Sequence, residues 1–225
     1  MLFFLSDFDT PILAEQESMH CIKVLRMKTG NPLEVTDGKG NWGTARIAEP
    51  NPKRCRLEIL ERIKKNKDWE GSIWLAVAPT KNIDRMEWMV EKCTEIGCDG
   101  FLFVRTARTE RDQINLERLQ KVAVSAMKQS GQAWLPEMIW AAKWSQIPWE
   151  KFSRIIIADL GSEKRTLERK KKDNCLIFIG PEGDFTQQEL ADLNTRKAES
   201  IRLRPQVLRT ETAALFALSM AQLSE

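Results

Sequence analysis

Four short apolar runs, separated by stretches of helical spacing, constrain the fold of this chain more than any other feature. The runs cover residues 73–77, 101–104, 155–158 and 176–179. Apolar residues at helical spacing fill residues 82–96 and 114–129. A continuous apolar run indicates a strand buried on both faces, and helices between such strands cover the two faces of a parallel sheet. We therefore predict an α/β domain built on a parallel sheet.

Three further elements are predicted towards the C-terminus. The spacing of Thr186 and Glu189 is that of a capping box, in which each side chain accepts a hydrogen bond from a free backbone N–H at a helix start. We therefore predict a helix from residue 186. Residues 201–204 form a last short predicted strand, and residues 212–223 have the spacing of a last helix.

The first part of the chain shows strand-like alternation instead of apolar runs. Residues 33–36 and 42–48 alternate on either side of Asp37-Gly38-Lys39-Gly40, and residues 55–60 repeat the pattern. An Asp-Gly step between two such segments is typical of a β-hairpin. We expect a small antiparallel barrel, which a short helix near residues 15–25 interrupts.

A polar stretch, residues 64–68, separates these two patterns. Exposed polar segments of this kind commonly connect domains. We therefore predict a barrel domain over residues 1–68 and an α/β domain over residues 69–225.

Composition excludes several classes of protein. With 42% hydrophobic and 30% charged residues, the 225-residue chain has the composition of neither a disordered protein nor a membrane protein. Its single histidine and its five cysteines, which contain no C-x-x-C pair, provide no zinc ligand set. The apolar N-terminus lacks the basic region of a signal peptide, so the cysteines are expected to be reduced thiols. We expect a cytoplasmic protein that binds no metal and no membrane.

The strongest local motif is Ile179-Gly180-Pro181-Glu182-Gly183-Asp184-Phe185, between a predicted strand and a capped helix. Ligands of open α/β sheets bind at the carboxyl ends of the strands, and Gly180 and Gly183 would let the backbone approach a ligand closely. The motif is neither G-x-G-x-x-G nor a Walker loop. An ordinary turn between strand and helix is an equally good interpretation of the motif alone.

A second motif, residues 203–213, joins the last strand to the last helix. It brings two arginines, two threonines and one glutamate to a helix N-terminus, where anions are favoured. Helix capping by Thr210 or Thr212, with Glu211 complementing the helix dipole, explains part of the motif. It does not explain Arg209, because a cation is disfavoured at this end of a helix.

Three basic clusters flank the predicted loops at the strand ends. Arg105, Arg108 and Arg111 follow one strand, and Lys128 lies near the end of the next helix. The third cluster contains Lys164, Arg165, Arg169, Lys170, Lys171 and Lys172. A solvated surface and contact with an RNA backbone are both consistent with this distribution.

Several motifs together resemble the RsmE-type 16S rRNA (uracil-N3)-methyltransferases of the SPOUT class. The resemblance covers nearly the whole chain, and its most specific motifs are residues 179–183 and 208–213 in that order. The other matching segments are residues 20–26, 37–40, 91–97 and 126–130, together with Lys81.

The resemblance implies an N-terminal PUA-like barrel that binds RNA and a C-terminal SPOUT α/β domain with a trefoil knot and a parallel sheet. It implies S-adenosylmethionine (S-adenosyl-L-methionine) as methyl donor, a homodimer, and 16S rRNA within the assembled small subunit as partner. The implied cofactor-binding residues are Leu160, Gly161, Ile179, Gly180, Pro181, Gly183, Leu203, Val207, Leu208 and Thr210. The implied RNA-binding residues are His20, Arg26, Lys81, Arg105, Arg108, Arg111 and Lys128.

The chain departs from the pattern of the family at four places. Asp184 stands where a second glycine is frequent, Asp112 where a serine is frequent, and Gln132 where an arginine is frequent. A glycine that often shortly precedes the position of Leu203 is also missing. Asp184 is compatible with a turn. Asp112 and Gln132, in contrast, weaken the inference that the RNA contacts of the family are also made at these two positions.

Methylation of uracil requires that N3 lose its proton, so the site needs a base or an electrostatic trap for the developing anion. Arg209 and Glu211 are the predicted catalytic residues. Arg209 would stabilise negative charge on the uracil oxygens, and Glu211 would orient Arg209 or accept the proton. Because a carboxylate is a weak base for so weak an acid, the electrostatic role is favoured.

Two alternative functions remain open from the sequence. The chain would be an RNA-binding protein with a cofactor-free α/β domain, or a methyltransferase that acts on another base or on a tRNA. His20 likewise has two interpretations, RNA contact and packing or capping on a helix face.

Overall fold

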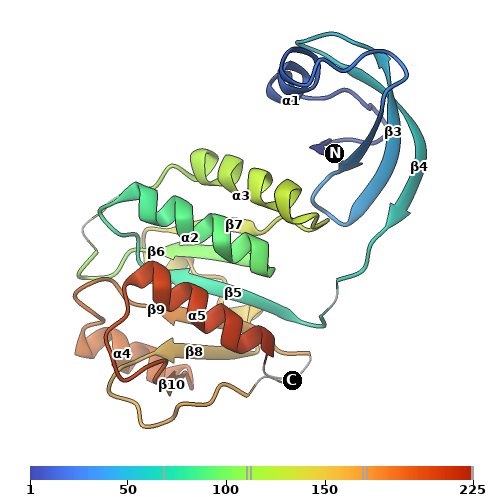
Figure 1. Cartoon of the computed structure of the whole chain (residues 1–225). Helices are drawn as coiled ribbons and strands as arrows, with labels where there is room; N and C mark the ends of the chain where they lie inside the picture. The colour runs from blue at the N-terminus through green and yellow to red at the C-terminus, as the bar shows by residue number, and fades with distance from the viewer. Residues whose placement is uncertain (68, 110, 112, 169, 171, 224–225) are drawn as a thin grey trace. The chain divides into compact units, whose positions relative to one another are not determined.

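The computed structural model describes residues 1–67, 69–109, 111, 113–168, 170 and 172–223 (Figure 1). The chain divides into two compact units. Unit 1 contains Met1–Asp68 and Val124–Leu135, and unit 2 contains Trp69–Ala123 and Pro136–Glu225. Asp112, a departure from the family pattern, and Arg169 and Lys171 of the third basic cluster lie outside the described residues.

Unit 1 contains a four-stranded sheet in the order β1-β2-β3-β4. The strands are β1 (Leu2–Phe4), β2 (Pro32–Thr36), β3 (Asn41–Glu49) and β4 (Arg56–Lys64). The predicted hairpin is confirmed, because Thr36 of β2 pairs with Trp42 of β3 across the Asp37–Gly40 loop. The predicted helix is also present, as α1 (Glu15–Met19) followed by a π-helical turn, η1 (His20–Val24).

The three predicted strands pair antiparallel, as expected, whereas β1, which was not predicted, makes the sheet of unit 1 mixed. β1 pairs with β2 in parallel, with Phe3 opposite Val35. A parallel pair needs a long crossover connection, and the segment that contains α1 and η1 supplies it. The N-terminal residues therefore contribute to the core, where Phe3 and Leu5 are each 1% exposed.

A segment from the middle of the chain completes unit 1. The Gly40 N–H donates to the Ala133 carbonyl at 2.8 Å, and the Leu135 N–H donates to the Gly38 carbonyl at 2.8 Å. Gly38 and Gly40 have φ angles of 69° and 87°, in the left-handed region that favours glycine. A Cβ atom on Gly40 would overlap the Trp134 ring. The Asp37–Gly40 loop thus both turns the hairpin and docks residues 133–135.

The sheet of unit 2 is wholly parallel, in the order β10-β8-β9-β5-β6-β7. Its strands are β5 (Ser72–Val77), β6 (Gly100–Val104), β7 (Glu137–Ala141), β8 (Arg154–Ala158), β9 (Asn174–Ile179) and β10 (Glu199–Ile201). The parallel sheet and its four apolar strands are confirmed. The edge strand β7 was not predicted.

The last strand lies earlier in the chain than residues 201–204, where the sequence predicted it. β10 pairs with β8 only as far as Ile201, which stands opposite Ala158, the last residue of β8. Beyond this point the Arg202 N–H donates to the Lys164 carbonyl at 2.7 Å, outside the sheet. The chain therefore leaves the sheet where its partner strand ends.

The principal helices of unit 2 begin and end at local signals. α2 (Ile83–Ile96) is capped by Asn82, whose side chain accepts a hydrogen bond from the Asp84 N–H, and it ends at Gly97 with a φ of 103°. α4 (Gln187–Thr195) has the predicted capping box of Thr186 and Glu189. The other helices are α3 (Leu116–Ser130), which passes from unit 2 into unit 1 at residue 124, α5 (Thr210–Leu223), and the short 3-10 turns η2 (Trp144–Gln146) and η3 (Trp149–Lys151).

Helices cover both faces of the unit 2 sheet, as predicted. α2 and α5 lie side by side on one face (Figure 1). On the other face, Leu193 of α4 belongs to a buried cluster with Trp74 and Ala76 of β5. The carboxyl ends of the strands are left to the loops.

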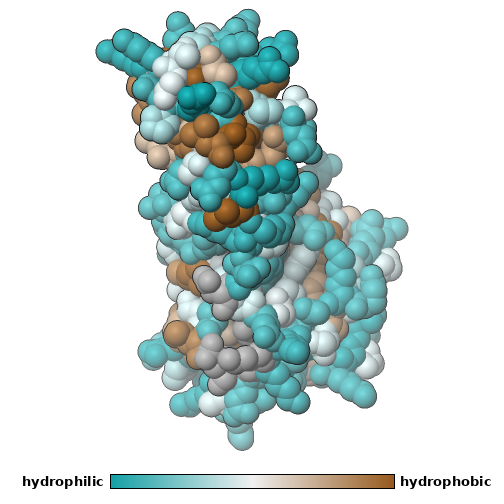
Figure 2. Space-filling view, turned by 90° about the vertical axis from the view of Figure 1, so that its right-hand side faces the viewer, coloured by the Kyte–Doolittle hydropathy of each residue, from teal (hydrophilic) through white to brown (hydrophobic). Residues whose placement is uncertain are grey.

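The five cysteines, Cys21, Cys55, Cys93, Cys98 and Cys175, are all buried thiols that form no disulfide. Burial raises the pKa of the Cys21 thiol to about 12. Among the described residues, no helix has the length and apolar character needed to cross a bilayer. On the face drawn in Figure 2, hydrophilic residues predominate and apolar residues gather in small patches.

Candidate active site

Three loops of unit 2 meet at the carboxyl ends of β8, β9 and β10 and enclose a cavity of about 500 Å³. We call it the loop cavity. Its lining consists of Ala158, Asp159, Leu160, Ile179, Gly180, Pro181, Glu182, Gly183, Asp184, Leu203, Arg204, Gln206, Val207, Leu208, Arg209, Thr210 and Ala213. The cavity lies where ligands bind in open α/β sheets.

The structure brings together nearly all of the predicted cofactor-binding residues. Every one of them except Gly161 lines the loop cavity. Gly161 follows Leu160 in the same loop, and its N–H donates to Asp159 Oδ1 at 2.8 Å. Two motifs that are far apart in the sequence, around residues 180 and 208, thus form one concave surface.

A hydrogen bond connects two of the loops directly. The Thr210 hydroxyl, in the first turn of α5, donates to the Gly180 carbonyl at 3.1 Å. Thr210 is 4% exposed. The start of α5 therefore fixes the backbone of the loop after β9.

Asp184, a departure from the family pattern, has a φ of 62°. The left-handed region is the one in which glycine is favoured, and aspartate is among the few other residues that enter it readily. The Asp184 N–H donates to the Pro181 carbonyl at 2.9 Å, which closes the turn. The conformation of a glycine loop is therefore retained with aspartate at this position.

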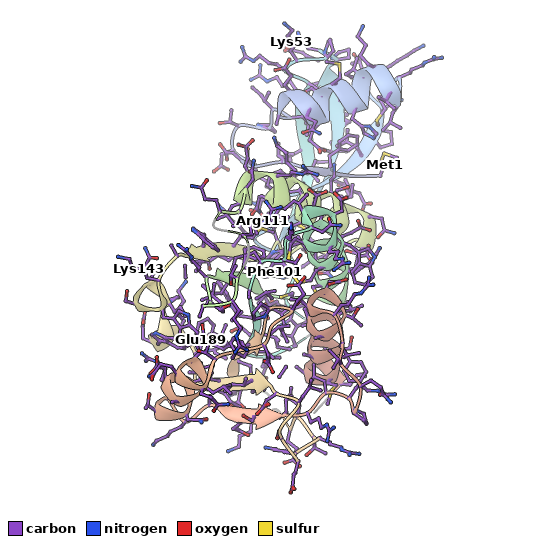
Figure 3. The ribbon with its side chains drawn as sticks, turned by 90° about the vertical axis from the view of Figure 1, so that its left-hand side faces the viewer. Met1, Lys53, Phe101, Arg111, Lys143 and Glu189 are labelled. Carbon is purple, nitrogen blue, oxygen red and sulfur yellow. The ribbon has the colours of Figure 1, made fainter. Side chains whose placement is uncertain are left out.

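Glu189 joins the loop after β9 to the loop after β6. This side chain, labelled in Figure 3, is only 8% exposed. It accepts a hydrogen bond from the Thr186 N–H at 2.7 Å and another from the Ala107 N–H at 2.7 Å. Arg108 donates to the Gly183 carbonyl. The capping residue of α4 thus also positions the segment that carries Arg105 and Arg108.

The predicted RNA-binding residues of unit 2 lie in the loops after β5 and β6. Lys81, Arg105 and Arg108 are exposed. Arg111 donates from Nε to the Thr80 carbonyl at 3.2 Å and from Nη2 to the Lys81 carbonyl at 2.6 Å. Arg111 therefore holds the loop after β5 in place.

The other predicted RNA-binding residues, His20, Arg26 and Lys128, lie in unit 1. His20 and Arg26 are exposed. Lys128 forms an ion pair with Glu17 of α1, and their side chains are only 21% and 13% exposed. The charge of Lys128 is therefore already balanced within unit 1.

The two predicted catalytic residues have different surroundings. Arg209 is exposed, whereas Glu211 is 7% exposed. The ion-pair partner of Glu211 is Arg85 of α2, whose Nε lies 3.7 Å from Glu211 Oε1. The Arg85 Nη1 also lies 4.0 Å from Glu182 Oε1.

Sequence reasoning did not single out Arg85. It stands in the first turn of an ordinary amphipathic helix, so no local pattern distinguishes it. Its place beside Glu211 results from the packing of α2 against α5, which brings residues more than a hundred positions apart into contact.

A second cavity of about 350 Å³ adjoins the loop cavity. Residues of the first two turns of α2 and the start of α5 line it, namely Asp84, Arg85, Trp88, Arg209, Glu211 and Thr212. We call it the helix cavity. Arg209 lines both cavities.

The loop cavity fits S-adenosylmethionine, the cofactor that the resemblance implies. A volume of about 500 Å³ is in the range of small-molecule sites. Leu160 and Val207 in its lining are 40% and 79% exposed, so apolar surface is available for an adenosyl group. Asp159, Glu182 and Asp184 bring carboxylates to a site for a ligand that carries a sulfonium and an ammonium group.

Comparison with known proteins gives two family matches. Residues 64–222 match the family described as RNA methyltransferase domain, and residues 13–60 match the RNA methyltransferase PUA domain.

Individual relatives and solved structures are similar over nearly the full chain. A probable rRNA-methyltransferase from Porphyromonas gingivalis is 33% identical, with a TM-score of 0.89 and coverage of 99% of this chain and 98% of that one. The ribosomal RNA small subunit methyltransferase E from Neisseria gonorrhoeae, solved with S-adenosyl methionine, is 25% identical, with a TM-score of 0.81 and coverage of 98% and 96%. The ribosomal RNA small subunit methyltransferase E of Bacillus subtilis is 25% identical over 91% of this chain and 86% of its own length.

Proposed function

The chain belongs to the RNA methyltransferase family, and from this premise we propose that it methylates N3 of a uridine in 16S rRNA of the small ribosomal subunit with S-adenosylmethionine as donor. The observation that carries the proposal is the loop cavity, which assembles the motifs around residues 180 and 208 at the carboxyl ends of the sheet. Similar proteins named ribosomal RNA small subunit methyltransferase E, one of them solved with S-adenosyl methionine, support the substrate and the cofactor.

The apolar lining of the loop cavity would hold the adenosine part of the donor. Leu203, Val207 and Leu208 come from one loop and Leu160 from another. The lining is completed by Ile179, Gly180, Pro181, Gly183 and Thr210. Gly161 would stabilise the loop that carries Leu160 through its hydrogen bond to Asp159. When bound, S-adenosylmethionine supplies a methyl group whose C–S bond breaks, with its electron pair left on sulfur, as the new N3–C bond forms.

Arg209 and Glu211 would serve the uracil. Arg209, which lines both cavities, would balance the negative charge that develops on the uracil oxygens as N3 loses its proton. Since the ion-pair partner of Glu211 is Arg85, we assign Glu211 to hold the N3–H rather than to orient Arg209. The electrostatic role stays the main one, because the positive charge of Arg209 makes N3–H more acidic and so allows the weakly basic carboxylate of Glu211 to accept the proton.

The RNA would be bound by both units. In unit 2, Lys81, Arg105, Arg108 and Arg111 are basic groups beside the loop cavity or on the loops tied to it. In unit 1, His20 and Arg26 are exposed and would contact the RNA, and they lie in the part that matches a PUA domain. Lys128, which is paired with Glu17, would support the fold of the unit rather than contribute a free charge. A homodimer, the trefoil knot, the assembled small subunit as substrate and a cytoplasmic location are parts of the same proposal, supported by the family resemblance.

Arg209→Ala tests the catalytic assignment in single-turnover methylation of small subunits that lack the modification. We expect a loss of about 100-fold or more in rate, because a charge-stabilising donor is removed from the reaction, with S-adenosylmethionine affinity kept in calorimetry. Arg196→Ala, an exposed arginine outside both cavities, is the control. A near-normal rate with cofactor bound would contradict the assignment.

The target base is tested by mass mapping of rRNA from a strain that lacks the gene. The proposal expects one unmodified uridine in 16S rRNA, restored by the wild-type protein. Loss of a modification at a base other than uridine, or loss of a modification in a tRNA, would mean that the enzyme has a different target. Failure of the protein to bind S-adenosylmethionine would instead favour a cofactor-free RNA-binding protein.

A further inference from the structure

Glu211, which lines the helix cavity, has a buried carboxylate oxygen without a hydrogen-bond partner among the described residues. Glu211 is 7% exposed, and its Oε2 accepts no hydrogen bond from any described residue. Its Oε1 faces Arg85 at 3.7 Å, beyond hydrogen-bond length. Leaving a buried carboxylate oxygen unpaired is costly, so such an atom calls for a donor from outside the protein.

The polar groups that line the helix cavity include both hydrogen-bond acceptors and donors. The carboxylate of Glu211 accepts hydrogen bonds, and the guanidinium groups of Arg85 and Arg209, which line the same cavity, donate them. A ligand complementary to one such acceptor and two such donors presents one N–H and two carbonyl oxygens. That is the arrangement of the imide edge of uracil, with N3–H between O2 and O4.

An aromatic surface is available on the same wall. Trp88 lies three residues after Arg85 in α2, so the two side chains share a face of the helix, and Trp88 is 42% exposed. An exposed indole beside a polar cavity is a stacking surface for a nucleic acid base.

The position of the helix cavity satisfies the demand of methyl transfer. The attacked nitrogen has to lie within contact distance of the donor carbon, so the two binding sites have to adjoin. The helix cavity and the loop cavity share Arg209, and the helix cavity, at about 350 Å³, has room for a pyrimidine ring.

We propose that the helix cavity is the binding site for the target uracil, extruded from the RNA, with Trp88 stacking on the ring and Arg85, Arg209 and Glu211 reading its imide edge. This inference rests on the proposed function and adds Arg85 and Trp88 to the substrate site. It predicts that recognition depends on the N3–H itself and that an N3-methylated product loses its hydrogen bond to Glu211.

The first test is binding of nucleotides to the full chain with S-adenosylmethionine present, observed by NMR of the indole N–H groups. Trp88→Phe identifies the Trp88 signal. Uridine 5′-monophosphate should shift that signal, and N3-methyluridine 5′-monophosphate, which lacks the donor, should bind at least about fivefold more weakly. An unmoved Trp88 signal up to the solubility of uridine 5′-monophosphate, or equal binding of the two nucleotides, would overturn the proposal.

The second test compares kcat/KM for small subunits with the affinity for S-adenosylmethionine. Trp88→Ala and Arg85→Ala should each lower kcat/KM about 10- to 100-fold and leave cofactor affinity unchanged, while Trp88→Phe keeps most of the activity. Lys92→Ala, another cation of α2 that lines neither cavity, should behave as the wild type. Normal kcat/KM in both alanine variants would overturn the assignment of the helix cavity as the uracil site. The proposed function would still be supported in that case by the activity of the wild-type protein.

Sedimentation of Trp88→Ala separates the base site from a contact between copies of the chain. Loss of activity together with a change in oligomeric state would assign Trp88 to such a contact and overturn the proposal. If the wild-type protein neither binds S-adenosylmethionine nor methylates rRNA, the proposed function itself fails, whatever the nucleotide titration shows.

Discussion

At the residue scale, backbone conformation explains both a motif and a departure from it. Gly38 and Gly40 have left-handed φ angles, and the ring of Trp134 stands where a side chain on Gly40 would extend. Asp184 adopts a φ of 62° and has a short polar side chain that tolerates this region. Glycine is thus required where a left-handed φ angle coincides with a neighbouring group that leaves no room for a Cβ atom. Where only the left-handed φ angle is needed, aspartate can replace glycine.

Gly40→Ala and Gly30→Ala separate the cost of a left-handed backbone conformation from the cost of overlap with a neighbouring side chain. Both glycines have similar φ angles, 87° and 86°, but a Cβ on Gly30 would meet no atom within 4 Å. We expect Gly30→Ala to lower the free energy of unfolding by about 1 kcal/mol through backbone strain alone. Gly40→Ala should cost about 2–4 kcal/mol, because overlap with Trp134 is added.

Chemical denaturation of both variants, followed by a signal from unit 1, measures the difference. Equal losses for the two substitutions would mean that Trp134 moves aside freely and would refute the packing argument.

At the element scale, the edge strand β10 depends on one ion-pair network. Arg154 of β8 donates from Nε to Glu199 Oε1 at 2.7 Å and from Nη2 to Oε2 at 2.9 Å, and Lys164 lies 2.8 Å from Oε2. Hydrogen bonds, first from Arg154 and then from Lys164, lower the pKa of Glu199 from 4.5 to about 2. A strand of three residues, Glu199–Ile201, is thereby fastened to the sheet beside the loop cavity.

Glu199→Gln tests this contribution through its pH dependence. Because the pKa of Glu199 is lowered in the folded state, its contribution is present above about pH 4.5 and is lost as the pH falls towards 2. The side chain is 37% exposed, so we expect a difference of only about 1 kcal/mol in the free energy of unfolding at pH 7. Urea denaturation from pH 7 to pH 2 should show the two proteins converging, and a constant difference over this range would contradict the assignment.

Elements with strong local signals could be predicted from the sequence, and those defined by pairing could not. Thr186 and Glu189 mark the start of α4 by side-chain chemistry alone, and the apolar runs of the central strands need no partner to be recognised. β7 lies at the edge of the sheet and has mostly half-buried residues, so its sequence lacks a buried run. β10 ends where β8 ends, which no local pattern records.

The same distinction applies to the candidate site. Residues of the loop cavity were found through motifs that are continuous in sequence, around residues 180 and 208. Arg85 became visible only through the packing of α2 on α5, because a helical face carries the same residue types whether it borders solvent or a cavity. The same packing is what distinguishes Trp88 from the other tryptophans of the chain.

At the scale of the whole molecule, the first 68 residues do not contain all of unit 1. Residues 124–135 belong to it, and their backbone bonds to Gly38 and Gly40 complete the hairpin loop. The Lys64 and Lys67 ammonium groups lie 5.1 Å and 5.0 Å from the centre of the Trp134 ring. The unit is therefore discontinuous in sequence.

A fragment of residues 1–68 should be markedly less stable than the same residues in the full chain. It would leave backbone groups of the Asp37–Gly40 loop unpaired and expose the surface that residues 124–135 cover. Joining residues 124–135 to it through a flexible glycine–serine linker should restore NMR dispersion and a cooperative thermal transition. A well-dispersed spectrum and cooperative unfolding of the unextended fragment would contradict the assignment of residues 124–135 to unit 1.

The discontinuity of unit 1 also sets an order of events during protein synthesis. The first 68 residues of unit 1 leave the ribosome before any residue of unit 2. The rest of unit 1 is synthesised later, and its last residue, Leu135, is made 67 residues after residue 68. At a synthesis rate of ~5–20 residues per second, roughly 3–13 s pass before residues 133–135 are available to form hydrogen bonds with the hairpin loop. During that interval the unpaired loop is open to chaperones, and the N-terminal unit, although made first, completes its fold only after the first two strands of the parallel sheet have been synthesised.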